Sequence, residues 1–256
     1  LRSHESTKGA LKGISPIFDV MPRAARIAPG GVVFHVLNRA NDRRTIFDTE
    51  GDYCAFERIL VRTTECIPMR VLSYSVMPNH WHLVLWPHED GDLAAFMHLL
   101  TTTHVRRWHL HRHTVGHGHL YQGTYKSFPV EVDDHLLTLC RYVERNPVRA
   151  GLVDRAELWP WGSAYLRIHR DTPFAKPTLA EPPVELPSDW IDFVNEPMTD
   201  AEIEACRESA RKGRPFGGEA WTKSAAEKLG LQATLRPRGR PRKSERDNEE
   251  RSSRRN

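Results

Sequence analysis

The sequence predicts an α+β fold of the ferredoxin-like type, in which helices pack on one face of an antiparallel sheet. Two observations lead to this prediction. Short segments rich in β-branched and aromatic residues alternate with longer segments whose apolar residues recur at helical spacing. Their order is strand, helix, strand, strand, helix, strand, helix, which is that of a split β-α-β unit followed by one more helix.

Three strands and one helix are predicted in the first third of the chain. The strands are bounded by turn-forming residues, with Asn41-Asp42 after the first strand and Pro78-Asn79 between the second and third. The helix is amphipathic. The predicted strands span residues 31–39, 69–76 and 80–86, and the helix spans 50–66.

Two further helices and a fourth strand are predicted next. Asp133 or Asp134 can cap the start of the last of these helices, and Pro147 is expected to stop it. The helices are predicted over residues 93–111 and 134–146, and the strand over 124–132.

Composition divides the chain into one domain and an extension. Proline-rich sequence predicts a linker, helical composition predicts an accessory region, and a basic tail with few apolar groups cannot offset its ordering entropy and is expected to be disordered. The expected division is an irregular leader at 1–20, the domain at 21–170, the linker at 171–187, the helical region at 188–235 and the tail at 236–256.

Charge and hydropathy exclude several classes of protein. Net charge is +4 over 256 residues, mean hydropathy is −0.56, and no apolar run approaches the roughly 18 to 20 residues of a membrane span. A cytoplasmic protein is therefore expected. The four cysteines contain no C-x-x-C pair, which argues against a disulfide framework and a thiolate zinc site.

A histidine pair is the sharpest indication of chemistry. His80 and His82 flank Trp81 in a predicted strand, where residues two apart share one face, so both imidazoles can converge on one cation while Trp81 points into the core. Imidazole suits transition metals and tolerates Mg or Mn when oxygen atoms complete the shell. On spacing alone, two ordinary polar residues of a half-exposed hairpin are the simpler interpretation.

Tyr142 lies off the apolar stripe of the last predicted helix. A tyrosine on such a helix usually packs in the core, but here its neighbours at helical spacing are polar and favour a phosphate site. The stripe consists of Leu136, Leu139, Cys140 and Val143, and the polar row of Thr138, Tyr142, Arg145, Asn146 and Arg149.

These two features together predict phosphodiester chemistry. A free phenol has a pKa of about 10, so Tyr142 needs a nearby cation or base to act as a nucleophile. A divalent ion, Mg or Mn, held by His80 and His82 could polarise the scissile phosphate, and Asn146 could supply a third ligand oxygen. The prediction requires the last helix and the hairpin to face each other.

Three segments, MPNHWHLVLWP, YQGTYKSFPVEVDDHLLTLCRYVERNPVRAGLV and WPWGSA, resemble the REP-associated tyrosine transposases, which belong to the single-tyrosine HUH (His, hydrophobic, His) transposases. The resemblance runs from about Gly31 to Arg167. It implies an HUH nuclease fold, a divalent metal on His80 and His82, and a 5′-phosphotyrosine on Tyr142 that leaves a free 3′-hydroxyl. Many relatives of the wider class carry Gln where this chain has Asn146.

The implied partner is single-stranded DNA folded into an imperfect hairpin, cut by a monomer or a homodimer. Expected phosphate contacts are Arg106, Arg107, Arg145 and Arg149. In the tail, Arg238, Arg240 and Arg242 belong to an RGRPR segment that resembles an AT-hook core. A solvated basic tail with salt-sensitive affinity is the alternative.

Two other functions stay open at this stage. The same strand order builds RNA-recognition domains, so the chain could be a non-catalytic module that binds hairpin nucleic acid. A zinc hydrolase with a metal-bound water as nucleophile is the second alternative, and its activity would survive the change Tyr142→Phe.

Overall fold

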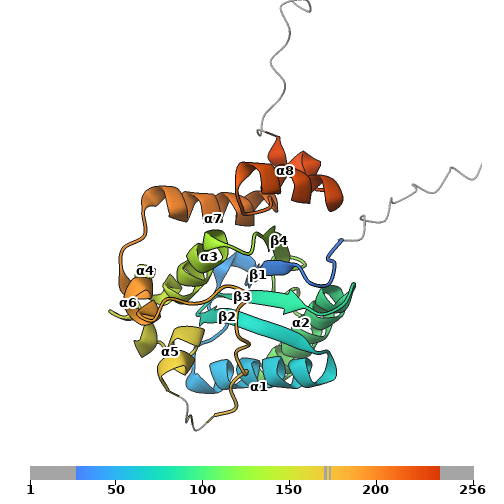
Figure 1. The fold of residues 1–256 in the computed structure, drawn as a ribbon. Coiled ribbons are helices and arrows are strands. Elements are labelled where there is room, and N and C mark those ends of the chain that lie inside the picture. The colour runs from blue at the N-terminus through green and yellow to red at the C-terminus, as the bar shows by residue number, and fades with distance from the viewer. Residues whose placement is uncertain (1–26, 170–171, 173, 237–256) are drawn as a thin grey trace, which may run out of the picture.

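The computed structural model describes residues 27–169, 172 and 174–236 (Figure 1). The predicted leader and the tail that carries Arg238, Arg240 and Arg242 lie outside the described residues. The strands are β1 (Val33–Arg39), β2 (Met69–Met77), β3 (His80–Pro87) and β4 (Lys126–Val130). The helices are α1 (Glu50–Cys66), α2 (Asp92–His111), α3 (Asp134–Glu144), α4 (Asn146–Arg149), α5 (Ser163–Ile168), α6 (Trp190–Asn195), α7 (Asp200–Lys212) and α8 (Glu219–Lys228). Three short 3-10 helices span Asn41–Arg43, Ala156–Leu158 and Gln232–Leu235.

The four strands form one antiparallel sheet in the order β2-β3-β1-β4, which confirms the predicted ferredoxin-like α+β fold. β3 lies in the interior of the sheet, between β1 and β2. Its register places His80 opposite Arg39 of β1 and His82 opposite Leu37 of the same strand. The histidine pair therefore sits where two central strands run side by side.

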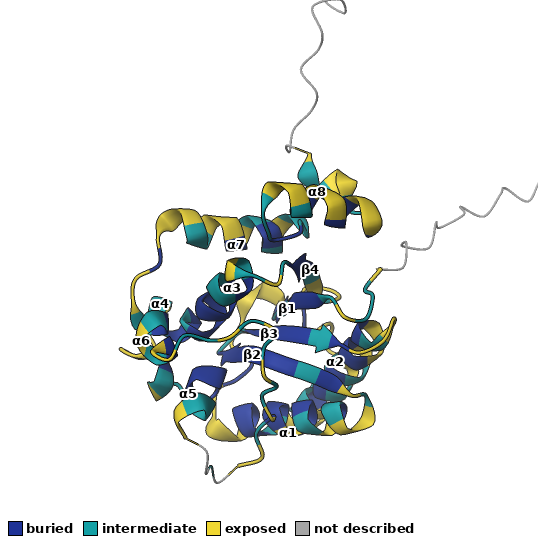
Figure 2. Cartoon of the chain, viewed as in Figure 1, coloured by how far each residue is buried: buried dark blue, intermediate teal, exposed yellow. Residues whose placement is uncertain are grey.

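Helices cover both faces of the sheet, so the prediction of helices on one face is wrong. Trp81 and Leu83 of β3 face a core shared with α1 and α2, whereas Val84 faces a second core shared with α3. The reason is that the strands are buried on both sides, as Figure 2 shows, and each apolar side needs its own cover. Across the described residues, every helix is too short or too polar to span a bilayer.

The helix that carries Tyr142 is shorter than predicted. It starts after Asp133, whose side chain accepts a hydrogen bond from the backbone N–H of His135, and it ends at Glu144. Pro147 lies beyond the end of this helix, in the first turn of α4, where its missing N–H costs no helical hydrogen bond. The predicted helix over 134–146 is thus α3 followed by the short α4.

The proline-rich segment lies against the free edge of β2. The backbone N–H of Ala180 donates to the carbonyl of Val71 over 2.9 Å, and Leu179 forms a parallel bridge with the same residue. Earlier in the same segment, the Nζ atom of Lys176 lies 2.7 Å from Oε2 of Glu57 in a buried ion pair. These contacts fix the course of the chain between α5 and α6.

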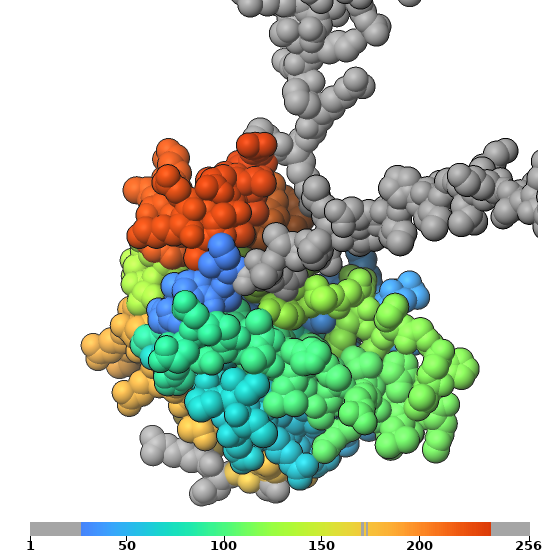
Figure 3. All heavy atoms as spheres, turned by 90° about the vertical axis from the view of Figure 1, so that its right-hand side faces the viewer, coloured from blue at the N-terminus to red at the C-terminus, as the bar shows by residue number. Residues whose placement is uncertain are grey.

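The last two helices attach to the opposite edge of the sheet. Helices are observed where sequence composition predicts them, and in Figure 3 they form the top of the molecule. After α7, the N–H of Phe216 donates to the carbonyl of Pro129, and the N–H of Glu131 donates to the carbonyl of Phe216, each over 2.9 Å. Phe216 thereby extends the sheet beyond β4.

Candidate active site

His80 and His82 lie on the face of the sheet that α3 covers. Their ring centroids are 5.0 Å apart with the rings nearly perpendicular, while Trp81 between them is fully buried on the other face. The alternation of side chains along β3 produces this arrangement. Two imidazoles therefore reach the same side of the sheet at neighbouring positions.

Both imidazoles are held in the neutral form. Burial, with the positive charges of Arg39 and Arg149, lowers the pKa of His80 to about 3. Burial likewise places the pKa of His82 well below its ordinary value, and the neighbouring His80 and His35 act in the same direction. Neutral imidazole is the form that binds metal ions.

The Nδ1 atom of each imidazole has a hydrogen-bond partner. Nδ1 of His80 lies 2.6 Å from Oδ1 of Asn79, which can only accept, so this Nδ1 carries the proton. Nδ1 of His82 lies 2.9 Å from Nε2 of His35. In the described part of the chain neither Nε2 has a partner, which leaves both available to a ligand.

His35 is a member of the site that sequence reasoning missed. It stands on β1, is fully buried, and stacks on His82 with ring centroids 5.1 Å apart. Burial lowers its pKa to about 3. Its Nδ1 is buried without a partner among the described residues. Leu37 lies opposite His82, and His35, two residues before Leu37, shares its face of the sheet. The sequence does not show that β1 pairs with β3, so His35 could not be assigned to this face from the sequence alone.

Tyr142 faces the histidine pair from α3. Its ring meets that of His82 edge to face with centroids 6.1 Å apart, and the Arg149 guanidinium carbon lies 4.2 Å from the centroid of the tyrosine ring. The helix and the hairpin thus face each other. Tyr142 is only 6% exposed, so it is more deeply packed than its place in a polar row predicts. The cause is that α3 lies between the sheet and α7.

Asn146 and Arg149 present unpaired donors beside Tyr142. Nη2 of Arg149 donates to Oδ1 of Asn146 over 2.6 Å, whereas Nδ2 of Asn146 and Nη1 of Arg149 are buried without a partner among the described residues. Buried donors of this kind are costly unless an acceptor satisfies them. An anionic oxygen is the acceptor that both groups favour.

These residues open into one pocket of about 540 Å³. The histidine pair, Tyr142 and Asn146 form part of its wall, and no carboxylate lines it in the described residues. The cations that line it come from β1, β4, α4 and α7 and are Arg39, Lys126, Arg149, Arg207 and Arg211. The wall therefore suits a polyanion.

Of these five cations, sequence reasoning found only Arg149. Arg106 and Arg107 are exposed on α2, which packs on the other face of the sheet. Arg145 does not line the pocket, because its Nη1 donates to the backbone carbonyls of Val194 and Asn195. The structure does not bring these three arginines to Tyr142, and their expected contact with DNA stays a prediction.

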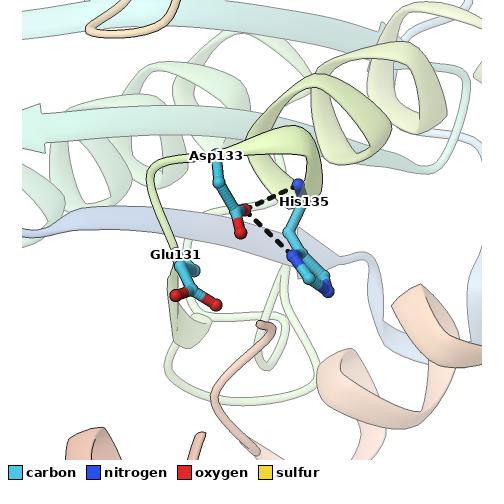
Figure 4. A group of neighbouring side chains, drawn as sticks. All are labelled: Glu131, Asp133 and His135. Carbon is cyan, nitrogen blue, oxygen red and sulfur yellow. Dashed lines mark hydrogen bonds and ion pairs between the residues drawn. The ribbon is translucent and has the colours of Figure 1, made fainter. Parts of the chain in front are cut away.

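A second group of potential metal ligands lies around the start of α3. Ligand atoms of Glu131, Asp133 and His135 all lie within 4.8 Å of one another (Figure 4). Each carboxylate has a structural task, since Asp133 caps α3 and Oε2 of Glu131 accepts the N–H of Gly218, 2.7 Å away at the start of α8. These two hydrogen bonds account for the positions of both carboxylates without a metal ion.

Comparison with known proteins finds a matching family model and similar proteins. The family model described as IS200-like transposase matches residues 31–146. A REP-associated tyrosine transposase of Haemophilus influenzae is 24% identical over 124 residues, which cover 45% of this chain and 68% of that protein. A solved REP-associated tyrosine transposase bound to a REP hairpin aligns with a TM-score of 0.46 and 16% identity, covering 63% of this chain and 100% of that one.

Proposed function

We propose that the protein cleaves and rejoins single-stranded hairpin DNA through a covalent bond to Tyr142, and the match of residues 31–146 to the IS200-like transposase family model supports this proposal. The observation that carries the proposal is the position of the Tyr142 ring, which meets the His82 ring edge to face in the wall of a pocket lined by five cations. The protein would act on this DNA in the cytoplasm. The proposed partner is a hairpin of the REP type.

The residues of the pocket fit a divalent ion, Mg or Mn. Its ligands would be Nε2 of His80, Nε2 of His82 and Oδ1 of Asn146, whose carbonyl oxygen keeps a second lone pair beside its bond to Arg149. The neutral state of both imidazoles and the occupied Nδ1 atoms support this assignment. When bound, the ion would supply positive charge next to the scissile phosphate.

In the cleavage step, the oxygen of Tyr142 forms a bond to phosphorus as the bond from phosphorus to the 3′ oxygen breaks. The phenol loses its proton, the 3′ oxygen gains one, and a 5′-phosphotyrosine results. Arg149 lies against the tyrosine ring and would stabilise negative charge as it develops on the phenol oxygen. The unpaired Nδ2 of Asn146 would donate to a phosphate oxygen. Joining reverses these steps with a 3′-hydroxyl as the attacking group.

A covalent adduct is the test. The purified protein, incubated with labelled single-stranded hairpin DNA and Mn or Mg, should yield a protein–DNA adduct on a denaturing gel. The variants Tyr142→Phe and His80→Ala should yield none. Tyr165→Phe is the matched control, because Tyr165 stacks on His169 outside the pocket and its loss should leave the adduct unchanged.

Other outcomes identify the alternative functions. Hairpin binding without an adduct would replace the proposal with a non-catalytic binding module. Cleavage that survives Tyr142→Phe would identify water, or another residue, as the nucleophile.

A further inference from the structure

Helix α7 lies outside the residues that match the family model, yet it forms part of the wall of the pocket. Its start is fixed by Arg141 of α3, whose Nη2 donates to the carbonyls of Glu196 and Pro197 over 3.0 and 3.2 Å. Its end is fixed by Phe216, which pairs with β4. The helix is therefore held against the nuclease domain at both ends.

The orientation of α7 directs one pair of arginines to the pocket. Cys206 and Ser209 are the buried residues of α7. Arg207 and Arg211, four residues apart on the same helix, line the pocket. Burial raises the pKa of Cys206 to about 12, and the Arg149 guanidinium acts in the opposite direction. Arg149 lines the same pocket as Arg207 and Arg211, so its charge adds to that of these two arginines.

The two arginines have little anionic compensation within the protein. Among the described residues Arg207 has no ion-pair partner, and Arg211 has only Glu204 at 3.6 Å, with both side chains at least half exposed. An exposed pair of this kind contributes little. With no carboxylate lining the described pocket, the strongest partner left for both guanidinium groups is phosphate.

We propose that Arg207 and Arg211 bind backbone phosphates of the single-stranded DNA beside the hairpin and guide that strand to Tyr142. The inference rests on the proposed function and adds the C-terminal region to its substrate site. Single-stranded DNA is favoured over duplex because Tyr142 is almost fully buried and is reached through the pocket that these arginines line.

Salt dependence of binding tests this role without relying on catalysis. Each phosphate contact to single-stranded DNA contributes about 0.7 to the slope of log K against log salt concentration. In a Tyr142→Phe background, the further changes Arg207→Ala and Arg211→Ala should reduce that slope by about 1.4 for two contacts. The probe is a fluorescent DNA hairpin with a single-stranded extension, titrated at several salt concentrations.

The matched control removes the same charge from α8. Lys223→Ala with Lys228→Ala changes two exposed lysines that do not line the pocket, and the slope should stay at the parental value. Equal slopes for the two double variants, or no binding of the probe by the parent, would overturn the inference. If the adduct fails to form but the slopes differ as expected, the nuclease proposal is wrong while the phosphate contacts stand.

Discussion

His35 has one hydrogen-bond partner among the described residues, Nδ1 of His82, and this bond decides which nitrogen of His82 can bind a metal. If His82 donates, its Nε2 keeps a lone pair that faces the pocket. If His35 donates, the proton of His82 moves to Nε2 and blocks it. The proposed metal binding therefore requires His35 to accept, which is the supporting role that groups behind metal ligands commonly play.

We expect His35→Phe to weaken Mn²⁺ binding by roughly 10- to 100-fold, the usual effect of losing such a support. His35→Gln, whose Oε1 can accept from His82, should retain most of the affinity. The measurement is the free Mn²⁺ signal in electron paramagnetic resonance as the ion is titrated into each protein.

Thermal unfolding without metal is the control, and both variants should remain folded. His35→Phe puts a ring next to Phe128, which already touches His35 edge to face. An affinity equal to that of the wild type would show that His35 only fills space.

Local spacing explains which parts of the site the sequence could predict. His80 and His82 share a face of one strand, and Tyr142 and Asn146 are one helical turn apart, so their spacing alone is informative. His35 reaches the site because β1 pairs with β3, and Arg207 because α7 packs beside the pocket. Neither contact can be predicted from residue spacing within one element. Arg145 was expected to contact DNA because it belongs to the polar row of Tyr142. Its hydrogen bonds to carbonyls at the end of α6 could not be predicted from the sequence.

At the scale of elements, the proline-rich segment is held by the buried pair Lys176–Glu57. Both side chains are almost inaccessible, and Glu57 also accepts from the hydroxyl of Tyr74 over 2.8 Å. Burial raises the pKa of Glu57, and the Lys176 ammonium acts against that rise. Removing the ammonium would leave a buried carboxylate without its cation.

Lys176→Met should lower the free energy of unfolding by about 3 to 5 kcal/mol at neutral pH. Because the pKa of Glu57 is raised in the folded state, stability falls as pH rises from the unfolded pKa through the folded one. Without Lys176 that pKa rises further, so the loss extends to higher pH. Urea unfolding at several pH values measures the effect.

Two variants accompany this measurement. Lys176→Met combined with Glu57→Gln should recover much of the stability and remove its pH dependence in this range, because no charge is then buried. Lys223→Met, at an exposed pair with Glu219, should change stability by less than about 1 kcal/mol. A similar loss at Lys223 and Lys176 would contradict the role of the buried pair.

Most elements were predictable, because periodicity and capping are local properties of the sequence. Strand pairing followed from the order of the elements. The assignment of helices to faces was wrong, since β2 is buried on both sides although it contains Ser73 and Ser75, and its sequence pattern does not distinguish one covered face from two. The division into a leader, a domain, a linker and an accessory region stays a prediction.

At the scale of the whole molecule, the site is complete within one chain. Tyr142 faces the His82 of its own sheet, and the chain after Tyr142 is bonded to that sheet again. Oγ of Ser163 accepts from the N–H of Tyr74 over 3.0 Å, and Arg167 donates to the carbonyl of Leu72 over 3.0 Å. Exchange of the tyrosine helix between two copies would break these buried bonds.

Mixing two inactive variants tests this arrangement. Under the proposed function, Tyr142→Phe mixed with His80→Ala should give no more adduct than the two proteins give separately. The gel assay with labelled hairpin DNA measures it, and wild-type protein diluted with either variant is the control. If mixing restored the adduct, two copies would have to exchange the tyrosine helix, as they would in a helix-exchanged homodimer.

Both outer strands of the sheet are covered by later parts of the chain, β2 by residues around Leu179 and β4 by Phe216. An uncovered edge strand is a template on which another chain can add a strand, and natural proteins protect such edges. A fragment trimmed to residues 31–146 would keep His80, His82 and Tyr142 and lose both covers. The C-terminal third of the chain therefore covers both sheet edges on which another chain could otherwise add a strand, and its removal is expected to favour aggregation.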